Sequence, residues 1–328
     1  MARASAVATG TRRQYLRAYS VFEAWLAEVH GLPVEAVASS PERLDSFCAA
    51  YVSDLCEEYG GQMKHLAKNL CHGIFLQLGE RLRGRLPELA RVTLAWDRLY
   101  PGSSHQPIPL SWMFLISITL ASRGLLRPAI AVQVAFDSFL RVSELLALTP
   151  EDVLLASDPR WAPSSSAGVG SSRTHRNLGG LRLRRTKTGA NQFAPIRDPV
   201  VARYLSWLCA CTPAGTLLFP FSPPTFNEHL ARSCADLRLP RFTAHCFRHG
   251  AACAAAQDGV EPERIRRWGR WRVPRSMDTY LQQVQALVLA HATPPHLLPF
   301  IRVAFLWRAH LESLGGPFLV PGGPGELC

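Results

Sequence analysis

The chain has 328 residues, of which 48% are hydrophobic, and its 36 Lys and Arg outweigh 25 Asp and Glu to give a formal net charge of +11. This apolar content is enough for one large core or two smaller ones and excludes a disordered tail, and the basic excess favours a polyanionic partner such as nucleic acid. The longest apolar stretch, around 112–121, is too short to span a bilayer, and nine irregularly spaced cysteines argue against a disulfide framework and for a reducing compartment.

The N-terminal part of the sequence predicts a helical domain over 11–100. Before it, residues 1–10 lack acidic side chains, as organelle transit peptides do, but a disordered terminus is the interpretation that we favour. Apolar residues at helical spacing, a capping Ser followed by Pro, and closing glycines mark the helices. These helical patterns cover 11–30, the segment that opens at Ser40 and Pro41, 62–78 and 86–99.

The stretch PGSSHQPIP (101–109) is dense in Pro, Gly and Ser and predicts a linker between two domains. A second domain is expected over 110–290, and 291–328 form a C-terminal tail. In this second domain helical patterns cover 109–122, 126–137, 139–148, 198–210, 225–237, 244–257, 262–268 and 274–290. The fold class is therefore mainly α with a small β-sheet (α+β).

The sheet is expected from GLRLRRTKTGANQFAPI (180–196), which predicts a basic β-hairpin that turns near Thr188 to Asn191. The preceding residues, 157–180, are too polar and too rich in Gly and Ser to pack, so we expect a mobile surface loop. Lys187 lies near the turn, where a long cation is able to reach a phosphate backbone. The alternative is a solvated strand edge guarded by charge.

Further candidate residues come from FLRVSELLALTPEDV (139–153), in which Arg141 and Glu144 are three residues apart on one predicted helical face. A carboxylate in that position is able to brace the guanidinium from the side. Taken alone, the pair is typical of an ordinary surface ion pair.

The stretch HCFRHG (245–250) places His245 and His249 four residues apart, with Arg248 between them, behind the capping residue Thr243. The start of a helix attracts anions, so these side chains are suited to an anionic group. The alternative is a metal site, because Cys253 continues the same helical face. We disfavour metal, because no acid at useful spacing completes a zinc ligand set and the HExxH motif is absent.

In RRWGRWRVPRSMDTY (266–280), cations, two tryptophans and Tyr280 come together. A lone tyrosine is usually a core or surface residue. Together, however, these segments resemble the tyrosine recombinase family, also called the phage integrase family, from about residue 11 to 290. HCFRHGAACAAAQDGV is similar to its HxxRH motif. The 23 residues from Arg248 to Trp271 and the nine from Trp271 to Tyr280 match the family's spacing from the second arginine to the His-or-Trp position and the nucleophile.

LRVSELLALTPEDV resembles the family's first-arginine motif, and TKTGANQFAPI resembles its lysine hairpin. Two features depart from the pattern. Leu140 stands where many relatives have glycine, and the stretch 157–180 lengthens the separation between Arg141 and Lys187. Because Arg184 and Arg185 lie close to Lys187, they remain alternatives for the role of the lysine.

The resemblance implies a recombinase or integrase that breaks and rejoins DNA through a 3′-phosphotyrosyl intermediate, without metal, cofactor or ATP. Arg141 and Arg248 would hold the scissile phosphate, Tyr280 would attack it, His245 would take or relay the phenol proton, and Lys187 would protonate the departing 5′ oxygen. Trp271 would line the site, Glu144 would orient Arg141, and His249 would support the site from behind. Contacts to the DNA backbone are expected from Arg182, Arg184, Arg185, Arg264, Arg266, Arg267, Arg270, Arg272 and Arg275.

The implied partners are double-stranded DNA, clamped between the two domains, and further copies of the chain in a tetramer on paired sites. The apolar stretch 297–313 either docks on a neighbouring protomer or folds back on its own domain. The implied location is intracellular and DNA-associated, in a bacterial cytoplasm, a eukaryotic nucleus or an organelle. Integration, excision, resolution and transposition of a mobile element all fit these residues. Two alternatives remain, a type IB topoisomerase and a domesticated DNA-binding protein without catalysis.

Overall fold

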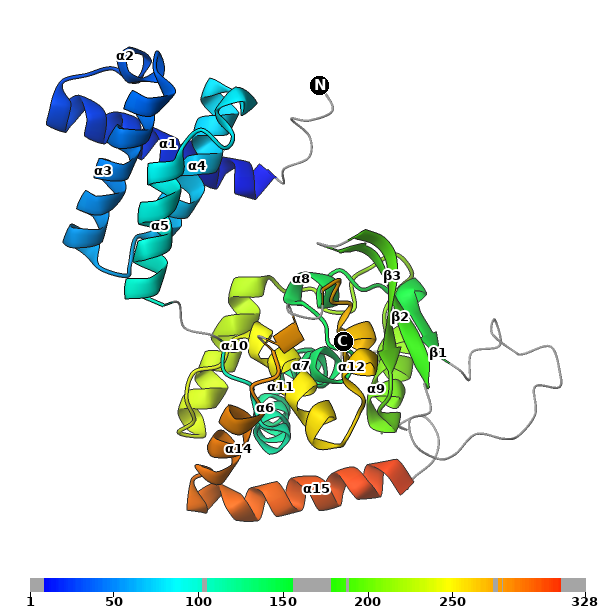
Figure 1. Cartoon of the computed structure of the whole chain (residues 1–328). Coiled ribbons are helices and arrows are strands. Elements are labelled where there is room, and N and C mark those ends of the chain that lie inside the picture. Colours follow the sequence, from blue (N-terminus) through cyan, green and yellow to red (C-terminus); the bar gives the residue numbers. More distant parts are fainter. Residues whose placement is uncertain are drawn as a thin grey trace. The chain divides into compact units, whose positions relative to one another are not determined.

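The computed structural model describes residues 9–101, 105–155, 178–186, 189–273, 277–278 and 280–313, with the backbone alone at 283 and 310–313. The chain divides into two compact units, Met1–Ser103 and Ser104–Cys328. Figure 1 shows the helices and strands of each unit, and each unit has a hydrophobic core of its own.

The N-terminal unit is helical. Its elements are α1 (Thr9–His30), α2 (Val34–Ala38), α3 (Pro41–Tyr59), α4 (Lys64–Leu78), the short 3-10 helix η1 (Glu80–Leu82) and α5 (Pro87–Leu99). Helix α3 begins as its sequence predicts, because the Ser40 hydroxyl accepts the Arg43 N–H at 3.3 Å and Pro41 occupies the first turn. The buried Asp45 carboxylate accepts the first N–H groups of α5 and so joins α3 to α5.

The second unit combines helices with one small sheet. Its elements are α6 (Leu110–Ser122), α7 (Leu126–Asp137), α8 (Val142–Leu145), η2 (Pro150–Asp152), β1 (Val153–Leu155), β2 (Gly179–Thr186), β3 (Gly189–Ile196), α9 (Pro199–Cys211), α10 (Pro223–Asp236), α11 (Ala244–Gln257), α12 (Pro262–Gly269), α14 (Gln283–His291), η4 (Pro295–Leu297) and α15 (Leu298–Ser313). The strands lie in the order β1-β2-β3, and both pairings are antiparallel. The predicted α+β fold class is confirmed.

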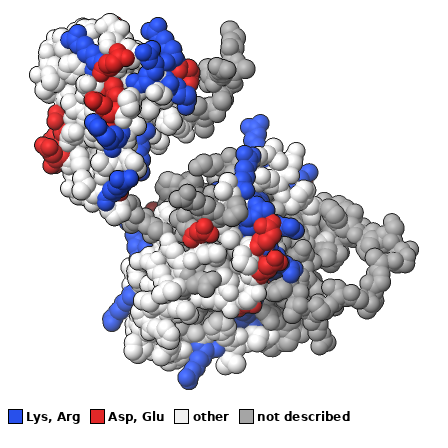
Figure 2. Space-filling view, in the orientation of Figure 1, with Lys and Arg blue, Asp and Glu red and all other residues white. Residues whose placement is uncertain are grey.

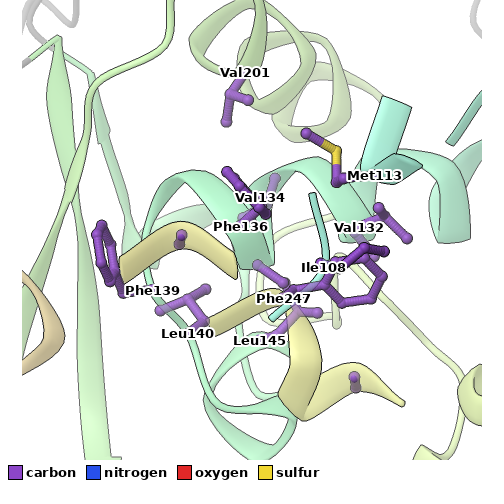
Figure 3. Close-up of a cluster of buried hydrophobic side chains, with 14 of the residues drawn as sticks. Ile108, Met113, Val132, Val134, Phe136, Phe139, Leu140, Leu145, Val201 and Phe247 are labelled. Carbon is purple, nitrogen blue, oxygen red and sulfur yellow. The ribbon is translucent and has the colours of Figure 1, made fainter. Parts of the chain in front are cut away.

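The centre of this unit is the pair α7 and α11, whose residues are mostly buried. Helix α7 packs against α6, α9 and α11, and Figure 3 shows α7 side chains such as Val134 and Phe136 in the same cluster as Phe247 of α11. Gly250 permits close packing of α11, because a Cβ there would lie 2.2 Å from the Ile108 carbonyl oxygen. The polar first turns of α11 are thereby fixed on a rigid base.

Several predicted boundaries were wrong. The helix expected over 139–148 is only α8, because Phe139 adopts a left-handed backbone with φ 54° and breaks the helical path. The helix expected over 274–290 is not continuous, since Leu281 and Gln282 are not helical and α14 begins afterwards. Strand β1 was not predicted. Strand β2 begins inside the stretch expected as a loop, most of which (157–177) lies outside the described residues.

Candidate active site

The first predicted site pair, Arg141 and Glu144, is joined in the structure, although not along a helical face. Arg141 is the residue that caps α8, and Glu144 lies in its first turn. The Glu144 carboxylate accepts the Arg141 N–H through Oε2 at 3.0 Å and the Arg141 Nη1 through Oε1 at 2.7 Å. Glu144 is only 3% exposed. The guanidinium of Arg141 is therefore braced by a buried carboxylate, as the sequence predicts.

Arg248 of α11 is fully buried, which is rare for an arginine. Its Nη1 donates to the Phe139 carbonyl oxygen at 2.5 Å, and its Nη2 donates to the Gly269 carbonyl oxygen. The Trp271 ring lies over the guanidinium with its centroid 4.5 Å away. Backbone carbonyl groups after the end of α7 and at the end of α12 therefore both bind the guanidinium of Arg248, which belongs to α11. Burial, together with the Arg141 and Arg270 cations, lowers the pKa of Arg248.

Tyr280 and the two predicted histidines form an aromatic group beside these cations. The Tyr280 hydroxyl lies 3.3 Å from Nε2 of His245, within hydrogen-bond reach of a general base. The His249 ring stacks on the Tyr280 ring with centroids 4.1 Å apart, and Trp271 lies at 4.8 Å from the same ring. Of the six residues predicted as catalytic, these elements bring together Arg141, His245, Arg248, Trp271 and Tyr280, while Lys187 lies outside the described residues.

A third histidine, His105, joins this group although sequence reasoning missed it. Its ring lies 4.8 Å from the ring of His245 and 5.9 Å from that of His249, centroid to centroid. Burial, with His105 and Arg248 among the neighbours, lowers the pKa of His245 to about 4. Burial, with His245 and His105, lowers the pKa of His249 to about 3. Both imidazoles are therefore neutral at pH 7, so His245 is able to accept a proton there.

Side-chain nitrogens without hydrogen-bond partners lie close together at this site, and those of Arg248, Arg270 and Trp271 are N–H donors. Among the described residues, four of its side-chain nitrogens are buried and make no hydrogen bond, namely Arg248 Nε, His249 Nδ1, Arg270 Nε and Trp271 Nε1. A buried polar group without a partner costs about 1–3 kcal/mol, so native proteins rarely keep several of them in one place. A ligand with several acceptor oxygens, such as a phosphodiester, would satisfy these N–H donors.

The arginines expected at the DNA backbone differ in their surroundings. Arg182 and Arg184 both bind the buried Asp152, at 3.2 and 2.8 Å. Arg185, Arg267 and Arg272 are exposed, and Arg266 and Arg267 bind Glu263. Arg264 packs over the ring of Trp268, and Arg275 lies outside the described residues. Figure 2 shows further exposed Lys and Arg side chains on both units.

Arg270 does not fit the prediction of a surface contact to DNA. Its side chain is 6% exposed, and its Nη2 donates to Oε2 of Glu144 at 2.6 Å. The sequence shows the charge of this residue but not its burial. Its place in the candidate site is therefore a correction to the predicted role.

No group of three His, Cys, Asp or Glu side chains among the described residues is arranged to hold a metal ion. Cys253, which would extend the histidine face, instead contacts the Tyr280 carbonyl oxygen through Sγ at 3.2 Å. Within the same described part of the chain, no helix combines the length and the apolar content that a membrane crossing needs.

Comparisons with known proteins give matches to solved structures only, since neither a family model nor a curated protein matches this sequence. The chain is similar to the Tn1549 transposon integrase in complex with circular intermediate DNA, with a TM-score of 0.57 and 12% identity, over 85% of this chain and 91% of that one. The same integrase in complex with transposon right end DNA gives a TM-score of 0.50 and 13% identity over 86% and 94%.

XerA recombinase also matches, with a TM-score of 0.41 and 14% identity over 86% of this chain and 99% of that one. At these identities a likeness establishes the fold. The two integrase structures show that this chain shares their fold, as the resemblance to the tyrosine recombinase family predicts.

Proposed function

We propose that the protein is a site-specific DNA recombinase or integrase that cleaves and rejoins strands through a 3′-phosphotyrosyl intermediate. The observation that carries the proposal is the Tyr280 hydroxyl, 3.3 Å from His245 Nε2, at the edge of a site that holds Arg141, Arg248 and unpartnered N–H donors. A nucleophile, a neutral base and fixed cations are the parts that a transesterification at phosphorus requires.

These residues account for each bond and each proton of the cleavage step. The Tyr280 oxygen attacks the scissile phosphorus, the new O–P bond forms as the bond from phosphorus to the 5′ oxygen breaks, and the phenol proton passes to His245 Nε2. Lys187, as the family resemblance implies, would give a proton to the departing 5′ oxygen. The phosphotyrosine retains the energy of the phosphodiester, so a free 5′ hydroxyl is able to rejoin the strand without ATP.

The cations would stabilise the charge that develops on the non-bridging oxygens. Arg141 is braced by Glu144 at one side and is partly exposed, so its fork is available for a bidentate grip. Arg248 already donates through Nη1 and Nη2 to carbonyl oxygens, and its Nε remains without a partner. We therefore expect a single contact from Arg248 beside the N–H of Trp271, rather than the second bidentate grip that the sequence suggested.

Double-stranded DNA is the proposed partner, and a tetramer on paired sites is the proposed assembly. The helix α15 packs on α6 and α9 of its own unit, and Arg308 of α15 forms an ion pair with Asp198. The apolar side chains of Phe300, Val303 and Leu306 on α15 are still exposed. An apolar face of this kind supports contact with a neighbouring protomer, in addition to the folding back of the tail.

The test uses a nicked suicide substrate labelled on the side that becomes 3′-linked, incubated with protein in EDTA and without ATP. Denaturing gel electrophoresis should reveal a covalent adduct for the natural sequence. The Tyr280→Phe variant loses only a hydroxyl, so it should bind DNA with unchanged affinity and form no adduct. An adduct with Tyr280→Phe would identify another nucleophile. A natural sequence that binds DNA but never forms an adduct would favour a DNA-binding protein without catalysis.

A further inference from the structure

We infer that Arg270 is a positioning residue of this active site, which holds Glu144 and through it sets the guanidinium of Arg141. The inference rests on the proposed function, because it concerns the same site.

The contacts of one carboxylate carry the inference. Glu144 Oε2 accepts Nη2 of Arg270 at 2.6 Å and the Arg141 N–H at 3.0 Å, while Oε1 accepts Nη1 of Arg141 at 2.7 Å. Arg270 is itself held, because its Nη1 donates to the Trp268 carbonyl oxygen at 3.1 Å. The carboxylate is therefore fixed from the α12 side by Arg270, and it fixes Arg141 on the α8 side.

The backbone of Arg270 adopts a conformation that favours glycine. Arg270 is the residue that ends α12, with φ 55° and ψ 38° in the left-handed region. Helices commonly end on glycine in this conformation, and a residue with a Cβ is strained there. Arg238 has the same conformation with an exposed side chain, so the backbone alone assigns no role. What distinguishes Arg270 is that its side chain is buried and paired with Glu144.

The charges around Glu144 also support a role for Arg270 in this site. Three guanidiniums, from Arg141, Arg248 and Arg270, surround the single carboxylate of Glu144. Burial raises the pKa of Glu144, but the Arg270 and Arg141 cations outweigh it and hold that pKa below its usual value. Transfer of an ion from water into the protein interior is costly, and pairing with one partner offsets that cost only in good geometry. An excess of buried positive charge is, however, favourable where an anionic phosphate is bound.

The expected consequence is a loss of rate with little loss of DNA affinity. Without Arg270, Glu144 Oε2 keeps only the Arg141 N–H, so the carboxylate is able to turn and Arg141 loses its fixed direction. A displacement of about 1 Å in a catalytic group can lower a rate roughly 10²-fold. Contacts to the DNA backbone elsewhere would be unchanged.

The experiment measures the single-turnover rate of adduct formation at saturating protein, and DNA affinity by gel shift. We expect Arg270→Gly and Arg270→Gln to lower the rate about 10²-fold at unchanged affinity, and Arg270→Lys, which keeps the charge, to recover part of the loss. The matched control is Arg238→Gly, because Arg238 is also a left-handed arginine, φ 54°, after a helix, but is exposed. This control should cleave at the natural rate.

A double-mutant cycle with Glu144→Gln separates positioning from mere stability. If Arg270 acts through Glu144, the Glu144→Gln/Arg270→Gln pair should be little slower than the slower single variant. Additive losses, or a natural rate for either folded Arg270 variant, would overturn the inference. Failure of the natural sequence to form any adduct would instead overturn the proposed function, so the two failures are distinguishable.

Discussion

Two histidines, the half-buried His245 and the buried His249, have lowered pKa values in the candidate site. Burial first, and then the neighbouring His105 and Arg248, lower the pKa of His245 to about 4. Burial first, and then His245 and His105, lower the pKa of His249 to about 3. An imidazole in an unfolded chain has a pKa of about 6.5. Between these values the unfolded state binds more protons than the folded state. The free energy of unfolding therefore falls as the pH is lowered from about 6.5 through the folded pKa values.

The expected outcome is a protein that loses stability in mild acid. Urea unfolding followed by circular dichroism should give a lower free energy of unfolding at pH 5 than at pH 7.5. The His249→Phe variant removes one of the two groups but keeps a ring beside Tyr280, so its stability should depend less on pH. Equal pH dependence for the natural sequence and the variant would show that His249 is not the group concerned.

Single site residues could be predicted from the sequence where a motif specifies their type and their distance along the chain. The motifs of the resembled family predicted Arg141, His245 and Tyr280 in this way. His105 carried no such signal, because it is a lone histidine in a segment rich in Pro and Ser. Tertiary contacts, among them the packing of Ile108 against Gly250, bring that segment to α11. Arg270 could not be told from surface arginines, because sequence does not show burial.

At the scale of elements, the end of α12 is built around a close approach. A Cβ on Gly269 would lie 1.7 Å from the ring of Trp271, which in turn covers Arg248. The Gly269 carbonyl oxygen also accepts Nη2 of Arg248. The absence of a side chain at Gly269 therefore lets Trp271 and Arg248 pack together.

Gly269→Ala should accordingly destabilise the protein by about 1–3 kcal/mol through overpacking, and it should slow adduct formation because Trp271 and Arg248 must move. The control is Gly180→Ala, whose added Cβ would meet only the Ala194 carbonyl oxygen at an ordinary 3.5 Å. Urea unfolding of both variants decides the point. A Gly269→Ala protein as stable as the control would contradict the packing described here.

Element types were easier to predict than element ends. Helical periodicity predicted α3, α9 and α10, and Ser40 with Pro41 marked the start of α3, because amphipathic spacing survives in the sequence. The short β1 gave no periodic signal, since three residues are too few to show alternation. The shortening of the helix at 139–148 depends on the left-handed Phe139, a conformation that tertiary contacts impose.

At the scale of the whole molecule, the net charge of +11 predicts how the protein should bind DNA. Each phosphate that a cation neutralises lowers the slope of log K against log[salt] by about 0.9. We expect a slope of several negative units in fluorescence anisotropy titrations across salt concentrations. Arg185→Gln removes one exposed cation on β2. This variant should make the slope about one unit less negative. Affinity that does not change with salt would exclude backbone contacts as the source of binding.

Three features remain predictions. They are the domain division into 1–10, 11–100, 101–109, 110–290 and 291–328, the tetramer, and the tail as a protomer-docking segment. Assembly on paired DNA sites tests the tetramer and the docking segment. A recombinase should form a tetramer there and exchange strands, whereas a type IB topoisomerase would relax supercoiled DNA alone. A two-site recombination assay beside a relaxation assay distinguishes the two functions.

The central claim is that Tyr280 becomes covalently bound to a 3′ phosphate, and one measurement tests it most directly. The adduct from a suicide substrate is digested with trypsin and nuclease, and the modified peptide is sequenced by mass spectrometry. We expect a nucleotide linked through its 3′ phosphate to Tyr280, in the peptide that also contains Met277 and Asp278. A nucleotide on any other residue, or a link through a 5′ phosphate, would contradict it.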